Sequence, residues 1–138
     1  MRIFIVTALL LGGLLMSVAP HAQTAPAAES KVLKHVVMYK FKPEITPLQV
    51  QEVVDAFLGL RDKVNANAGA PGIILNIEHG TNTSTEGKSD GLTHIFVVTF
   101  SGEGGLETYL KHPAHDAYVL VVKDRREKVV VFDYLAPR

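Results

Sequence analysis

The chain of 138 residues contains no cysteine and no tryptophan. Without cysteine it forms no disulfide, no thiolate nucleophile, no cysteine-ligated zinc site and no thioether link to haem. Basic and acidic residues balance at 14 each, so no long-range field gathers nucleic acid or anionic lipid. A chain of this length holds one hydrophobic core rather than two. The composition therefore predicts one globular domain without a nucleic-acid partner.

The N-terminus carries the one long hydrophobic run. Arg2 precedes an apolar stretch from Ile3 to about Val18, and small residues and prolines follow it. This order is typical of a secretory signal peptide, with cleavage after Ala22 or Ala27. The stretch is shorter than the ~20 residues of a transmembrane helix. We expect a signal peptide over 1–27, a secreted or periplasmic protein, and no membrane contact after cleavage.

A linker to residue 31 leads into the predicted folded domain, residues 32–136. Segments rich in β-branched and aromatic residues predict four strands, at 32–41, 73–79, 93–100 and 128–135. Thr46 and Pro47 begin a helix whose apolar positions continue to Val64. Two further helices are expected before the last strand, one short and one from Pro113 to about residue 126. The order β-α-β-β-α-β indicates the α+β class with a ferredoxin-like fold.

The predicted strands are apolar on both faces. In the first strand Val37 and Tyr39 alternate with Val36 and Met38, and the third and last strands behave likewise. Right-handed crossovers place both helices on one face of the sheet. The other face leaves an apolar patch of roughly a few hundred Å², a size that requires a partner. We expect a homodimer in which two sheets close into a dimeric α+β barrel.

Two histidines lie within predicted strands. His35 and His94 each share a face with apolar neighbours. A histidine in such a place is more often a hydrogen-bonded core residue than a ligand. If both lie on one face of neighbouring strands, they line one cavity.

The segment "YLKHPAH" brings together two histidines, a proline and a tyrosine. His115 falls in the first turn of a helix, whose positive end keeps the imidazole neutral and available as a base. Tyr109 can donate a hydrogen bond to a substrate oxyanion. The alternative is a helix that begins at Pro113, with His112 as a surface cap. No metal is expected, because the motif lacks the glutamate of H-E-x-x-H and a third ligand.

Four motifs together resemble the stress-responsive A/B barrel (Dabb) domain: "LKHVVMYKFK", "GLTHIFVVTF", "YLKHPAH" and "VVVFDY", over residues 33–135. The resemblance implies a ferredoxin-like unit paired into a barrel. One plant member of that family is a cofactor-free polyketide cyclase. Similarity to it implies that Tyr109 and His115 are catalytic and that His35 and His94 line the pocket.

The function remains open between two classes at this level. One is an exported homodimer that binds a small hydrophobic molecule or acts in stress without catalysis. The other is a cofactor-free lyase or cyclase that acts on a carbonyl compound through Tyr109 and His115. Related barrels that oxidise quinols or degrade haem are disfavoured, because the chain has no tryptophan and no axial-ligand pattern. The longer loop through Lys88 and the segment "DAYVLVVKD" depart from the cyclase pattern next to the pocket.

Overall fold

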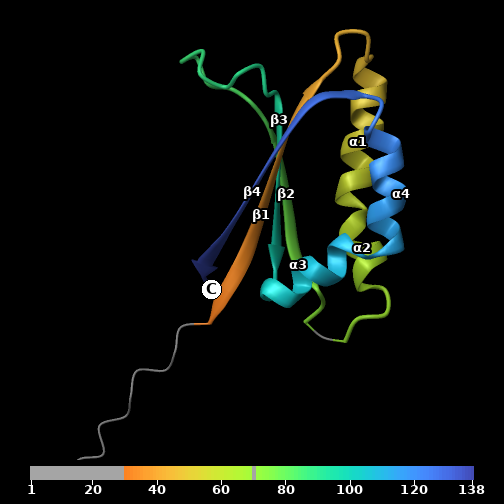
Figure 1. Cartoon of the computed structure of the whole chain (residues 1–138), viewed down its shortest axis with the longest axis vertical. Coiled ribbons are helices and arrows are strands. Elements are labelled where there is room, and N and C mark those ends of the chain that lie inside the picture. Colours follow the sequence, from red (N-terminus) through yellow and green to blue (C-terminus); the bar gives the residue numbers. More distant parts are fainter. Residues whose placement is uncertain (1–29, 70) are drawn as a thin grey trace, which may run out of the picture.

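The computed structural model describes residues 30–69 and 71–138, so the predicted signal peptide lies outside the described residues. Four antiparallel strands form one sheet in the order β2-β3-β1-β4. The strands are β1 (Lys31–Phe41), β2 (Ile74–Thr81), β3 (His94–Phe100) and β4 (Arg126–Pro137). The helices α1 (Pro47–Leu58), α2 (Leu60–Asn65), α3 (Glu103–Leu110) and α4 (Pro113–Val122) lie together on one side of the sheet (Figure 1). The predicted α+β ferredoxin-like fold is confirmed.

The helix after β1 begins as the sequence predicts and then divides. Thr46 accepts a hydrogen bond from the Gln49 amide, and the Gln49 side chain bonds back to the Thr46 amide. Pro47 occupies the first helical position, where it loses no hydrogen bond. A single helix to Val64 was predicted, whereas α1 ends before Gly59 and α2 follows it. Glycine is a weak helix former, which explains a break at this residue.

The last helix is shorter than predicted and the last strand is longer. α4 ends at Val122, and the Arg125 amide bonds to the Val122 carbonyl to close a turn. β4 begins at Arg126, opposite Phe41 at a register shift in β1. Charged residues extend this pairing, since Lys40 and Glu127 form an ion pair at 2.7 Å. Among the described residues, no helix is long and apolar enough to cross a membrane.

The hydrophobic core fills the space between the sheet and the helices. Val37, Phe96 and Val98 face the helices, and each has at most 5% of its surface exposed. Phe57 of α1 stacks on Phe96 of β3 with ring centroids 4.1 Å apart. Tyr118 of α4 packs edge-on against Phe57 at 5.0 Å. These contacts fix α1 and α4 over the centre of the sheet.

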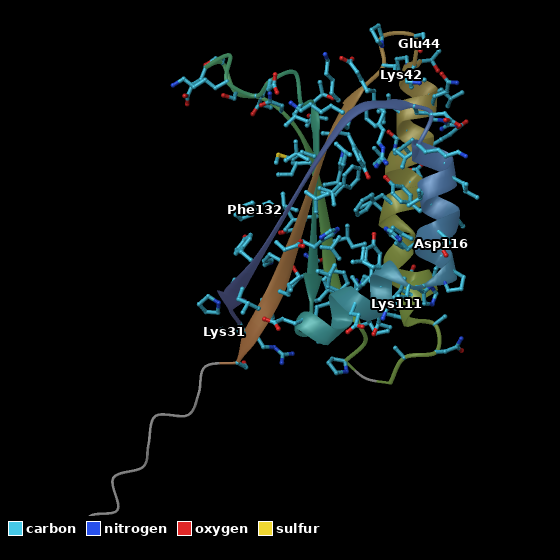
Figure 2. All side chains as sticks on the ribbon, viewed as in Figure 1. Lys31, Lys42, Glu44, Lys111, Asp116 and Phe132 are labelled. Carbon is cyan, nitrogen blue, oxygen red and sulfur yellow. The ribbon has the colours of Figure 1, made fainter. Side chains whose placement is uncertain are left out.

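The opposite side of the sheet, which we call the rear face, is apolar and uncovered. It consists of Val36, Met38, Ile95, Val97, Val130, Phe132 and Tyr134, which alternate with the core residues of their strands. Phe132 is 62% exposed and lies on the side away from the helices (Figure 2). The alternation predicted from the sequence therefore holds, and no described helix covers the rear face.

Candidate active site

A cavity of about 340 Å³ lies between the helix-facing side of the sheet and helices α3 and α4. Its wall combines seven apolar side chains with seven that carry a polar group, which are His35, Tyr39, Tyr109, His115, Tyr118, Arg126 and Asp133. An apolar cavity with a few convergent polar groups is the usual form of a small-molecule site. Three of the four predicted site residues are in this group.

Tyr109 and His115 lie side by side in the cavity wall. Their ring centroids are 4.6 Å apart and the rings meet edge to face. Tyr109 ends α3 and His115 lies in the first turn of α4, so the turn between the two helices sets their separation. The His112 amide bonds to the Tyr109 carbonyl at 3.0 Å and closes this turn. The structure thus brings together the two residues that the sequence paired.

His115 has the electrostatics of a neutral base. Burial lowers its pKa below the ordinary value of 6.5, and the nearby His35 acts in the same direction. The Asp116 carboxylate and the Leu110 main chain partly oppose this shift. The Nδ1 atom is buried and has no hydrogen-bond partner within the described part of the chain. Burial, rather than the helix end alone, therefore keeps this imidazole uncharged near neutral pH.

Burial has the opposite effect on the tyrosine hydroxyls of the cavity. It raises the pKa values of Tyr39, Tyr109 and Tyr118 above their ordinary value of 10.0. Each hydroxyl consequently keeps its proton at neutral pH and is able to donate a hydrogen bond. Tyr109 is 1% exposed and its ring is held by Phe100 at 5.3 Å. A rigid, protonated phenol beside a neutral imidazole is suited to acid–base chemistry.

His112 has a structural role as a helix cap, which was the alternative considered for it from the sequence. It is the N-cap of α4, and its Nδ1 accepts a hydrogen bond from the Ala114 amide at 3.1 Å. Pro113 follows at the first helical position. An accepting side-chain atom at this position satisfies one of the main-chain N–H groups at the start of the helix. His112 is not among the residues that line the cavity.

His35 is held by a partner that the sequence reasoning missed. Its Nδ1 donates to Asp133 Oδ1 at 2.6 Å, from β1 to the neighbouring β4. The His35 ring meets Tyr109 edge-on at 6.0 Å and Phe100 at 6.2 Å. The sequence did contain a signal for Asp133, because this carboxylate follows a run of apolar residues in the last strand and stands at a helix-facing position. Arg126, Tyr39 and Tyr118 were also missed as cavity residues.

His94 does not share the cavity of His35, which corrects the prediction. Both lie on helix-facing positions, but His35 pairs with Val98 and His94 pairs with Tyr39. The offset of four residues separates them by about 13 Å along the sheet. His94 instead stacks on His79, with ring centroids 5.6 Å apart. The alternation of side chains correctly puts the two histidines on the same face of the sheet. It does not determine how far apart they lie along the strands.

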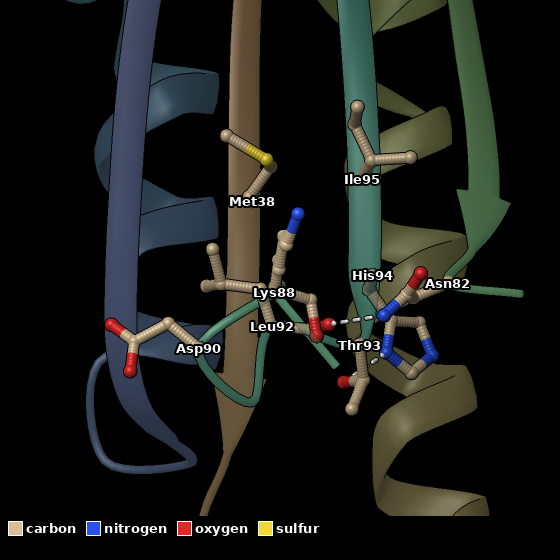
Figure 3. Close-up of a pocket in the computed structure, with 9 residues that line it drawn as sticks. Met38, Asn82, Lys88, Asp90, Leu92, Thr93, His94 and Ile95 are labelled. Carbon is tan, nitrogen blue, oxygen red and sulfur yellow. Dashed lines mark hydrogen bonds between the residues drawn. The ribbon is translucent and has the colours of Figure 1, made fainter. Parts of the chain in front are cut away.

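His94 borders a second cavity of about 380 Å³ beneath the β2–β3 loop (Figure 3). Met38 and Ile95 of the rear face form part of its wall. Asn82 donates to the Leu92 carbonyl at 3.3 Å, and Thr93 bonds to His94 Nδ1 at 2.8 Å. This cavity is similar in volume to the first but belongs to the rear face, and neither Tyr109 nor His115 lines it. The acid–base pair therefore locates the candidate active site in the first cavity.

A family model for the stress responsive A/B barrel domain matches residues 33–136. The chain belongs to this family. The resemblance seen in its four motifs is thereby confirmed, over nearly the same residues. As a member of this family, the chain is similar to olivetolic acid cyclase from Cannabis sativa, with 31% identity over 102 residues. That alignment covers 74% of this chain and 94% of the cyclase.

Another relative is the stress-response A/B barrel domain-containing protein HS1 from Arabidopsis thaliana. It is 28% identical over 102 residues, which cover 74% of this chain and 87% of that protein. The chain is thus similar both to a protein named as a cyclase and to one named for its stress-response A/B barrel domain.

Solved structures show the same architecture. A protein from Jannaschia sp. CCS1, described as dimeric and ferredoxin-like, has a TM-score of 0.60 and 25% identity and covers 75% of this chain and 97% of its own. The hydroxynitrile lyase from Passiflora edulis has a TM-score of 0.69 and 18% identity and covers 79% of this chain and 96% of its own. At that identity the likeness to the lyase shows the fold alone.

Proposed function

We propose that this A/B barrel protein is a cofactor-free acid–base enzyme of the lyase or cyclase class that acts on a small carbonyl compound. The single observation that carries the proposal is the contact of Tyr109 and His115, at 4.6 Å between ring centroids, in the wall of a largely apolar cavity of about 340 Å³. Similarity to olivetolic acid cyclase supports the same class.

The chemistry begins with a proton transfer. The neutral His115 imidazole removes a proton from the carbon next to the carbonyl, and the electron pair of that C–H bond forms an enolate. Tyr109 donates a hydrogen bond to the enolate oxygen, where the negative charge develops. The enolate carbon then attacks a second carbonyl of the same molecule, and the imidazolium returns its proton to the new alkoxide. The overall change is an intramolecular carbon–carbon bond formation that needs no cofactor.

The first step is testable without knowledge of the natural substrate. We suggest incubating the protein in D₂O with 4-oxopentanoate, 6-oxoheptanoate and their methyl esters, and following deuterium uptake beside the ketone by NMR. The expected result is uptake above the buffer rate for at least one ketone, reduced by about 10²–10⁴-fold in His115→Gln. His112→Asn is the matched control, because asparagine is a good N-cap and His112 lies outside the cavity. Equal rates of deuterium uptake in the wild type and in His115→Gln would contradict the catalytic proposal.

A second candidate is a binding protein of the same fold without turnover, and one observation favours it. His35, the most buried histidine of the cavity, is already hydrogen-bonded to Asp133 and needs no ligand. The relative described by stress response is also consistent with this reading. Saturable ketone binding without any deuterium uptake would select this candidate over the enzyme.

We also propose that the protein is a homodimer joined through its rear face. Phe132, Tyr134 and Ile95 are at least 36% exposed there, and the helices cover only the other side of the sheet. A contiguous apolar patch of this kind marks an interaction surface. The Jannaschia protein of the same fold is described as dimeric. Sedimentation of the purified protein at micromolar concentration tests this, with a monomer as the contrary result.

Export is the remaining part of the proposal. It rests on the sequence of residues 1–27, with their single arginine, apolar run and small-residue cleavage zone. Mass spectrometry of the protein purified from its own host gives the mature N-terminus directly. An N-terminus at Gln23 or Ala28 is expected, and an intact Met1 in the cytoplasmic fraction would contradict export.

A further inference from the structure

The cavity contains a cation that the acid–base pair does not use. Arg126 begins β4 and lines the cavity together with Tyr39 and Tyr118. The guanidinium group of its neighbour Arg125 already has partners, because it forms an ion pair with Glu52 at 2.8 Å and donates to the Gln49 carbonyl at 3.0 Å. Arg126, by contrast, has no carboxylate partner within 4.0 Å anywhere in residues 30–69 and 71–138. Arg126 is half-buried in the cavity wall, and a guanidinium group there is suited to bind an anionic ligand.

The two tyrosine hydroxyls beside Arg126 add a hydrogen-bond donor. Tyr118 and Tyr39 are both buried, and their hydroxyl oxygens lie 3.0 Å apart. One hydrogen bond joins them, and it uses one of their two protons. Whichever hydroxyl donates within the pair, the other keeps a proton to donate outward. Arg126 lies close enough for its charge to affect the pKa of Tyr39, partly opposing the rise that burial causes.

The register of the sheet separates this group from the opposite charge in the cavity. Arg126 pairs with Phe41, whereas Asp133 pairs with His35 at the other end of the same two strands. The six-residue offset between Phe41 and His35 corresponds to about 20 Å along β1. The cavity therefore has a cationic end at Arg126 and a carboxylate at its other end. An anionic ligand group is attracted to the first and repelled by the second.

We propose that the substrate is a small keto acid with two ketone groups, with its carboxylate bound by Arg126 and the Tyr39–Tyr118 hydroxyl pair and its ketone carbonyls presented to Tyr109 and His115. This inference rests on the proposed function of the same cavity and adds its substrate class. Guanidinium and phenol groups match a carboxylate through charge-assisted hydrogen bonds. The apolar side chains between the two ends, among them Val37 and Val129, contact the carbon chain that joins the two groups.

The test compares each acid with its neutral ester. Calorimetric titration of 6-oxoheptanoate and methyl 6-oxoheptanoate into the wild-type protein gives the two affinities. The acid is expected to bind about ten-fold more tightly or better, as is typical of a hydrogen bond to a charged group. Arg126→Gln abolishes this preference while leaving the affinity for the ester unchanged. Arg126→Lys keeps the charge and retains part of the preference.

Control variants distinguish binding of the carboxylate in the cavity from a general attraction of anions by the charge of the protein. Lys123→Gln removes one positive charge from an exposed residue near the end of α4 and leaves the preference unchanged. Tyr118→Phe removes one hydroxyl of the pair and lowers the preference a few-fold. Thermal unfolding of each variant checks that the fold is retained, and Tyr118→Phe and Arg126→Lys keep the test valid if Arg126→Gln unfolds.

The possible failures are distinguishable. Equal affinity of the wild type for acid and ester, with deuterium uptake on both, overturns the keto-acid inference and leaves the acid–base function intact. The same loss of preference in Lys123→Gln as in Arg126→Gln also overturns the inference. If neither compound binds and neither takes up deuterium, the keto-acid inference and the proposed function fall together.

Discussion

His35 and Asp133 lie 98 positions apart in the sequence, yet their side chains meet at 2.6 Å across the β1–β4 pair. The bond fixes the His35 tautomer with its proton on Nδ1 and sets the ring edge-on to Tyr109. Through His35, the bond therefore links the edge strand β4 to Tyr109, which donates a hydrogen bond to the enolate oxygen in the proposed reaction. The side chain of His35 is 7% exposed and that of Asp133 is 41% exposed.

We predict measurable energetic coupling between these two residues. His35→Ala and Asp133→Ala each destabilise the protein, and the double variant loses less than the sum of the two. The coupling is expected at about 1 kcal/mol, because Asp133 remains partly in water. Urea unfolding of the four proteins of the cycle gives this value. Additive losses would show that the bond seen at 2.6 Å contributes no free energy of its own.

Tyr109→Phe isolates the contribution of one hydroxyl to the reaction. The ring is held by Phe100 and His115, so the variant is expected to fold and to bind ketones with little change in affinity. Deuterium uptake falls by about 10²–10³-fold, as for the loss of one oxyanion donor. NMR exchange and calorimetry on the same sample measure both quantities. A fall in binding with unchanged turnover of the bound ketone would assign the hydroxyl to binding alone.

Stability should decrease in mild acid. Burial lowers the pKa values of His79, His94 and His115 below 6.5, while the unfolded chain has the ordinary value. Below pH 6.5 the unfolded state therefore binds more protons, and the free energy of unfolding falls as pH drops until the folded pKa values are passed. Urea midpoints at pH 7.5 and pH 5.5, at one protein concentration, measure the loss.

A single substitution checks the origin of this pH dependence. His79→Gln removes one titrating group and also the repulsion that His79 exerts on His94. The variant should lose less stability than the wild type between the two pH values. The lowered pKa values of Asp90 and Glu107 do not contribute here, since carboxyl groups titrate below about pH 5. Equal midpoints for the wild type at both pH values would contradict the prediction.

Phe132→Glu tests the rear face as the dimer interface. Phe132 is 62% exposed in the single chain, and a carboxylate there cannot be buried against a second copy without a large penalty. The variant is expected to sediment as a folded monomer at concentrations where the wild type is a dimer. Leu120→Glu is the matched control, because Leu120 is 65% exposed on α4, on the helical side. Dimers of equal strength in both variants would move the interface elsewhere.

Asn65 anchors the segment that joins α2 to β2. Its Oδ1 accepts from the Ile73 and Ile74 amides at 2.9 Å and 3.0 Å, and its Nδ2 donates to the Ile74 carbonyl at 2.7 Å. Asn65→Ala should cost about 1–3 kcal/mol of stability, because these main-chain groups lose their partner. Asn67→Ala, at an exposed position of the same turn, should cost less than about 0.5 kcal/mol. Urea unfolding compares the two.

The sequence alone determined much of the fold, because its signals are local. The capping box at Thr46 specifies where α1 begins, and Pro113 specifies where α4 begins. Two-residue alternation in β1 and β3 determines which side chains are buried and which form the rear face. The four family motifs, in order along the chain, were sufficient to indicate the A/B barrel domain.

The sequence also paired Tyr109 with His115, since one short turn separates them. What it could not determine was the register between distant strands. Parity places His35 and His94 on one face, but only the hydrogen-bonded pairing shows that they lie four residues apart. The same pairing brings Asp133 to His35 and leaves Arg126 near Tyr39. Strand register depends on contacts between segments far apart in the chain, so only the tertiary structure assembled the polar groups of the cavity.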